Sequence, residues 1–166
     1  LDEYYTNFDP GSGGALDAAI AGAFKKGKPV FSYYWTPTGL MGKVDLVQLE
    51  EPAYDNACWT KMMAVVEKIK ADGPDAYTDT CASAYVNMAL TKSASTTFAN
   101  KKSNKKIIDF VRAYSVPTPD VNRSLAFYMD ESGGDMEATA KHFLSNTGMW
   151  TKWVPADVAA KVKDTL

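Results

Sequence analysis

The chain has 166 residues, of which 46% are hydrophobic and 12% aromatic, so it can bury a core and is neither disordered nor fibrous. Its 18 basic and 20 acidic residues give a net charge of −2, which excludes the broad positive field of most proteins that bind nucleic acids or anionic membranes. One histidine and two cysteines leave little for a zinc site or for histidine catalysis, so we expect no metal, no cofactor and no catalytic group. No segment has the length of a membrane span, and residues 1–4 lack the basic start of a signal peptide.

The first half of the chain alternates between helical and strand patterns. Apolar residues at helical spacing behind Ser12 predict a helix over residues 12–26. Residues 29–35 are rich in β-branched and aromatic side chains and predict a strand that ends at Trp35, before a Thr-Pro turn. Further along, the patterns predict a strand over 44–49, a helix over 59–71, a loop at 72–75 and a strand over 84–90.

The second half is predicted to be helical. Four apolar stripes begin at Ile107, Val121, Met136 and Val158, and Thr118 is expected to cap the second of these helices with Pro119 at its first position. Strands interleaved with helices, followed by helices alone, predict an α/β protein with few strands for its length.

Trp35 is the main candidate for a binding residue. A tryptophan at the carboxyl end of a strand lies where open α/β sheets place their ligands. An exposed indole face attracts a quaternary ammonium, at about 0.5 to 2 kcal/mol per ring. The alternative is a core tryptophan that covers the sheet. Ser12 is a minor candidate, because the start of the helix behind it could hold the anionic end of a small ligand, although a plain helix-capping loop is the favoured interpretation.

Cys58 and Cys81 could form one disulfide, or both could be buried free thiols, and the sequence does not separate the two. A cysteine nucleophile would need His142 beside it, and no spacing suggests this. The lysines at 101, 102, 105 and 106 are interpreted as the solvated face of a helix, so no nucleic-acid partner is expected. Trp150 and Trp153 are interpreted as packing anchors between the last two helices.

Two runs of sequence carry a resemblance to a known family. Residues 27–37 read Gly-Lys-Pro-Val-Phe-Ser-Tyr-Tyr-Trp-Thr-Pro, and residues 44–52 read Val-Asp-Leu-Val-Gln-Leu-Glu-Glu-Pro. Together they resemble the substrate-binding proteins of ABC transporters for glycine betaine, proline betaine and choline. The resemblance implies a type II periplasmic-binding fold whose two lobes close on the ligand. It also implies an extracytoplasmic location at the membrane, a permease partner, and aromatic rings that box the quaternary ammonium.

Within this resemblance, Trp35 looks like the box residue supplied by the second lobe, with Tyr34, Thr36, Thr38 and Ser12 as weaker ligand contacts. Relatives place His-Trp or Tyr-Trp after the proline, where this chain has Thr38 and Gly39. Residues 1–80 are expected to be mostly lobe two, and residues 81–166 a crossover strand and helices that return to lobe one. Because family members are longer, the chain is expected to be a C-terminal half whose exposed strands could exchange between two copies.

The functional prediction is therefore a solute-binding component of an ABC importer that binds a quaternary ammonium without changing it. Rival solutes are carnitine, a sulfonium analogue and proline. A hydrolase that uses His142, and a structural interaction module with a buried Trp35, are predictions from other classes.

Overall fold

The computed structural model describes residues 3–4, 6, 8–73 and 81–166 and divides the chain into two compact units. The first unit comprises Leu1–Leu46 and Ala94–Leu166, and the second comprises Val47–Ser93. The predicted lobes, 1–80 and 81–166, stay a prediction. Their expected boundary adjoins residues 74–80, which lie outside the described residues, as does the second half of the loop expected at 72–75.

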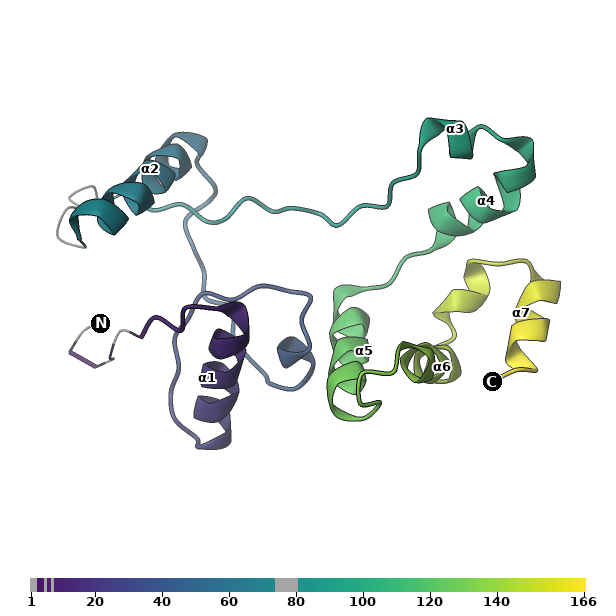
Figure 1. Cartoon of the computed structure of the whole chain (residues 1–166), viewed down its shortest axis with the longest axis horizontal. Coiled ribbons are helices and arrows are strands. Elements are labelled where there is room, and N and C mark those ends of the chain that lie inside the picture. Colours follow the sequence, from purple (N-terminus) through teal and green to yellow (C-terminus); the bar gives the residue numbers. More distant parts are fainter. Residues whose placement is uncertain (1–2, 5, 7, 74–80) are drawn as a thin grey trace. The chain divides into compact units, whose positions relative to one another are not determined.

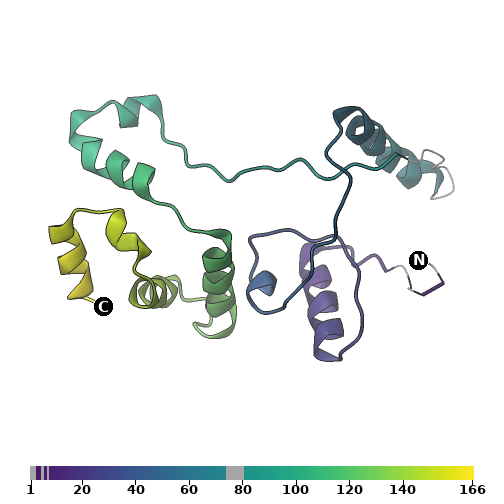
Figure 2. The same cartoon turned by 180° about the vertical axis from the view of Figure 1, so that it is seen from behind.

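The first unit is built of helices and short 3₁₀ turns. Helix α1 (Gly13–Lys25) comes first, followed by the turn η1 (Leu40–Gly42). After the second unit the chain forms α3 (Thr96–Ala99), η3 (Lys102–Asn104), α4 (Lys105–Ala113), α5 (Thr118–Asp130), α6 (Met136–Asn146), η4 (Met149–Lys152) and α7 (Ala156–Lys163). Helix α6 packs on α5, and η1 packs on α5 as well, where both views show it beside the helix (Figures 1 and 2).

The helix ends show why these segments fold locally. The Ser12 hydroxyl accepts a hydrogen bond from the backbone N–H of Ala15 and so caps α1. The expectation that Thr118 caps α5 is wrong by one residue: Pro117 is the cap and Thr118 opens the helix. Pro119 is therefore the second helical residue, where proline is tolerated because it lacks the backbone N–H, which would have no partner in the first turn, and its φ is already near the helical value.

The second unit holds one long helix, α2 (Asn56–Asp72), which begins three residues before the predicted start at 59. Asp55 caps it by accepting a hydrogen bond of 2.6 Å from the N–H of Cys58. A disulfide joins Cys58 to Cys81, with 5.9 Å between the two Cα atoms. The backbone N–H of Asp55 donates to the Ser83 hydroxyl, so the segment after residue 81 lies against the start of α2.

The three predicted strands, 29–35, 44–49 and 84–90, are not formed, and the described residues contain no strand at all. The α/β expectation is therefore not met in this part of the chain. A high β-propensity means only that a side chain fits well on a pleated, half-buried surface. A stable strand also needs a neighbouring strand that pairs with its backbone hydrogen-bonding groups. None of these segments forms a ladder of backbone hydrogen bonds in the described residues, and the one such bond to a segment distant in sequence is that of Ala84 to Pro52, so the apolar side chains stay largely exposed.

The buried apolar residues are few. In the first unit they are Ile20, Leu40, Ile108, Trp150 and Ala159. Trp150, at 4% exposure, lies between α6 and α7 and donates its indole N–H to the Leu144 carbonyl over 2.8 Å. This position agrees with the packing role predicted for it.

Candidate functional site

Trp35 lies beside the first residue of α1 and keeps 43% of its surface exposed. A Cβ added to Gly13 would stand 3.3 Å from the Cη2 atom of the indole, so the ring rests against the backbone at the helix start. The Tyr34 ring stacks on the indole, with centroids 4.8 Å apart, and the Tyr33 ring lies 5.9 Å away at a tilt. The structure therefore presents a partly open aromatic surface at the start of a helix.

Tyr34 is fixed to α1 by a hydrogen bond. Its hydroxyl donates to a carboxylate oxygen of Asp17 over 2.6 Å. Burial raises the pKa of Tyr34, and the hydrogen bond to Asp17 raises it further, while a side-chain hydrogen bond with Thr38 lowers it. The hydroxyl therefore stays protonated and keeps donating to Asp17, which holds the residue before Trp35 in place.

The residues after Trp35 are fixed to α5. The side-chain oxygen Oδ1 of Asn122 accepts hydrogen bonds from the Thr36 hydroxyl at 3.2 Å and from the Thr38 backbone N–H at 2.9 Å. Asn122 is only 7% exposed. Thr38 also accepts a hydrogen bond from the Met41 N–H, which starts the turn η1. Asn122 thus joins α5 to the loop that follows the candidate binding residue.

Glycine lets this loop lie close to α5. A Cβ on Gly42 would collide with the backbone carbonyl of Asn122 and would stand 2.9 Å from the Cβ of Ala126. At the far end of the loop, the Lys43 ammonium pairs with the Asp130 carboxylate over 2.6 Å. The contact therefore extends from Thr36 to Lys43 along one side of α5.

The N-terminus of α1 offers donors next to Trp35. The described contacts give no acceptor to the backbone N–H groups of Gly13 and Gly14, whereas that of Ala15 is taken by the Ser12 hydroxyl. Ser12 therefore serves the helix first, and the two glycine N–H groups are better placed than its hydroxyl to hold an anion.

The remaining candidates lie elsewhere. Cys58 and Cys81 are bonded to each other in the second unit, so neither is a free thiol. His142 stacks flat on Phe127, with centroids 3.8 Å apart and an angle of 10°. Within the described ranges no cluster of three metal-ligating side chains is found. No helix among them is both long and apolar enough to cross a membrane.

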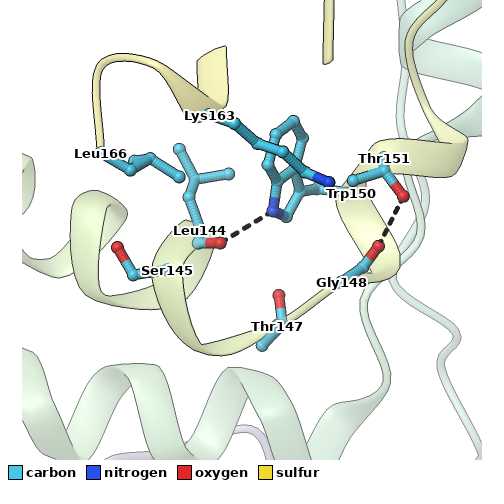
Figure 3. A pocket seen from close by; sticks show the side chains of 8 residues that line it. All are labelled: Leu144, Ser145, Thr147, Gly148, Trp150, Thr151, Lys163 and Leu166. Carbon is cyan, nitrogen blue, oxygen red and sulfur yellow. Dashed lines mark hydrogen bonds between the residues drawn. The ribbon is translucent and has the colours of Figure 1, made fainter. Parts of the chain in front are cut away.

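Two hollows in the first unit lie away from Trp35. One, of about 380 Å³, is open to solvent and is bordered by the end of α6, η4 and α7, with Thr147, Trp150 and Lys163 around it (Figure 3). The other, of about 340 Å³, is lined mainly by apolar side chains that include Tyr114, Phe143 and Trp153. The rings of Trp153 and Tyr114 already contact each other edge to face, with centroids 4.7 Å apart, so these aromatic residues pack on one another.

Sequence reasoning missed two residues of the site, Asp17 and Asn122. Asp17 follows Leu16 in the first helix, where an acidic residue near the N-terminus is ordinary. Asn122 follows Val121 in an otherwise apolar stripe, and a polar side chain at a core-facing position was the one signal that could have marked it.

Comparison with known families gives one match. The family model for the substrate binding domain of the ABC-type glycine betaine transport system matches residues 1–146. The matched span includes α1, Trp35, the loop after it and α5. Neither the curated proteins nor the solved structures contain a match to the chain.

Proposed function

Because the chain belongs to the family of substrate-binding domains of ABC-type glycine betaine transport systems, we propose that it binds a small quaternary ammonium solute at Trp35 and presents it to a membrane permease. Members of this family have the type II periplasmic-binding fold, act outside the cytoplasm and serve transport rather than catalysis. The observation that supports the site is the half-exposed Trp35 ring beside the start of α1, where the described contacts give the N–H groups of Gly13 and Gly14 no acceptor.

The cation is assigned to the aromatic surface. Tyr34 already covers part of the indole, so the ligand would meet the exposed remainder of Trp35, with the Tyr33 ring 5.9 Å away as a second wall. One cation–π contact contributes about 0.5 to 2 kcal/mol, which corresponds to about a 2- to 30-fold change in the dissociation constant. Thr36 and Thr38 are lesser contacts, because Asn122 already engages the hydroxyl of the first and the N–H of the second.

A carboxylate on the same ligand would be held by the N–H groups of Gly13 and Gly14. These groups point out of the helix end, and the helix dipole favours a negative charge there. Because Gly13 lies close to the indole, a short zwitterion could place its carboxylate at the glycine N–H groups and its ammonium, a few bonds away, on the Trp35 ring. This arrangement favours glycine betaine or proline betaine over choline, which has no carboxylate.

The first experiment tests the cation site. Calorimetry with glycine betaine, and with choline, carnitine, a sulfonium analogue and proline as competitors, should give binding that Trp35→Leu weakens about tenfold. Trp59→Leu is the matched control, because that tryptophan packs on Tyr85 in the second unit. Equal affinity in the wild type and Trp35→Leu would refute the assignment.

The second experiment tests the anion site. Gly14→Pro removes one N–H at a position where proline is tolerated, and Gly14→Ala keeps that N–H. A Cβ at this position would meet nothing within 4 Å, so Gly14→Ala introduces no clash and serves as the control. We expect Gly14→Pro to weaken glycine betaine binding while leaving choline binding unchanged. A loss that is equal for both ligands would contradict a carboxylate at this helix end.

The competing functions have different signatures. A hydrolase would need a nucleophile beside His142, and loss of turnover in His142→Ala would support it. A strand-exchanged dimer stays a prediction, and it would have to use the exposed apolar segment at 84–90, where Met88 and Leu90 are 79% and 82% exposed. Light scattering should then show a dimer that Met88→Lys with Leu90→Lys converts to a monomer, and a monomeric wild type would refute it.

A further inference from the structure

We infer that Asn122 is a positioning residue for the ligand site, and that α5 sets the orientation of Trp35 through it. This inference rests on the proposed function of Trp35 as the cation-binding ring. Asn122 is not itself placed to touch the ligand. It is buried, and its Oδ1 is occupied by Thr36 and Thr38.

Trp35 stands between two anchored neighbours. The residue before it is tied to α1, because Tyr34 donates to Asp17 over 2.6 Å. The residue after it is tied to α5, because Thr36 donates to Asn122. An indole next to a freely moving chain would sample several rotamers, and ordering it would cost part of the binding free energy. With both neighbours fixed, the ring stays against Gly13, ready for the ligand.

A second, independent feature supports the same contact. Gly42 lies so close to α5 that any side chain there would strike the Asn122 carbonyl. The loop is therefore fitted to the surface of α5 by shape as well as by hydrogen bonds. Asn122 thereby ties the loop after Trp35 to α5 within the first unit.

The chemistry of the two hydrogen bonds suggests a sharp test. Both bonds are accepted by Oδ1, so Asn122→Asp keeps both acceptor functions whereas Asn122→Leu, of similar size, removes them. We expect Asn122→Leu to raise the dissociation constant for glycine betaine about tenfold, and Asn122→Asp to stay within about threefold of the wild type. Asp130→Asn is the matched control, since it frees the far end of the same loop at Lys43.

A readout without ligand separates positioning from general stability. In protein labelled with 5-fluorotryptophan, the ¹⁹F resonance that disappears in Trp35→Phe belongs to Trp35. That resonance should shift or broaden in Asn122→Leu and stay unchanged in Asn122→Asp and Asp130→Asn. Gly42→Ala should reproduce the Asn122→Leu result, and it covers the case in which Asn122→Leu does not fold.

The outcomes distinguish this inference from the proposed function. If the wild type binds no quaternary ammonium solute, the proposed function fails, while the ¹⁹F signal still reports whether Asn122 orients Trp35. If the wild type binds and Asn122→Leu retains the same affinity and the same Trp35 resonance, the positioning role is overturned. Loss of thermal stability alone, with affinity and resonance unchanged, also overturns it.

Discussion

The disulfide between Cys58 and Cys81 should hold the second unit together. The two cysteines are 23 positions apart, and closing a loop of that length lowers the free energy of folding by about 3 kcal/mol in the chain-entropy model. The bonded segments are also joined by two hydrogen bonds, from Asp55 to Ser83 and from Ala84 to Pro52, and by the Trp59–Tyr85 ring pair at 4.6 Å. At about 1 kcal/mol for each contact, these contribute about as much as the disulfide.

Replacing both cysteines by serine should therefore remove about half of what holds the segment after residue 81 against α2. A loss of 3 kcal/mol raises the population of the open form by about two orders of magnitude. Amide hydrogen exchange followed by mass spectrometry measures this directly: α2 should exchange about a hundredfold faster, while α5 in the first unit should not change. Reducing agent should reproduce the effect in the wild type and add nothing in the double serine variant. Exchange of α2 within about threefold of the wild type would refute the reasoning.

Three smaller perturbations test local contacts. The pKa of Tyr34 lies above its ordinary value of 10.0, so the stability that the protonated hydroxyl contributes is complete below pH 10.0 and is lost as the pH rises through the raised pKa. Asp17→Ala should lower this pKa, which tyrosinate absorbance measures with Tyr34→Phe as the blank. Ser12→Ala should cost about 1 kcal/mol of stability in thermal unfolding, and Ser12→Asn almost nothing, because asparagine also caps helices. Trp150→Phe should cost about 2 kcal/mol, since the Leu144 carbonyl loses its buried donor; an unchanged melting temperature would show that another donor replaces the indole.

The helices were the predictable part of the fold. Ser12 and Pro155 stand directly before their helices, and helix-start signals are local, so a short window of sequence is enough to find them. The cap at Asp55 was missed, so α2 was predicted to begin three residues late. The strands failed for the opposite reason. Residues 29–35 have the composition of a strand, but strand pairing depends on a neighbour that a local window does not contain.

The candidate site shows the same difference between features set by local sequence and features set by contacts distant in sequence. Trp35 was proposed as a binding residue from its own neighbours in the sequence, because an aromatic run that ends in a Thr-Pro turn is a local signal. The residues that orient it were not. Asp17 lies 17 positions before Tyr34, and Asn122 lies 86 positions after Thr36, so only the folded chain brings each pair together.

This difference bears on how the ligand would be recognised. A ring identified from local sequence supplies the attraction for a cation, at about 0.5 to 2 kcal/mol, but it does not supply its own orientation. Orientation comes from Asp17 on one side and Asn122 on the other, and these two residues lie on different helices. A ligand that needs the oriented ring therefore also favours the arrangement of α1 and α5 that makes both hydrogen bonds. Affinity at Trp35 and the packing of residues 36–38 on α5 should then change together in the variants that disturb Asn122 or Gly42.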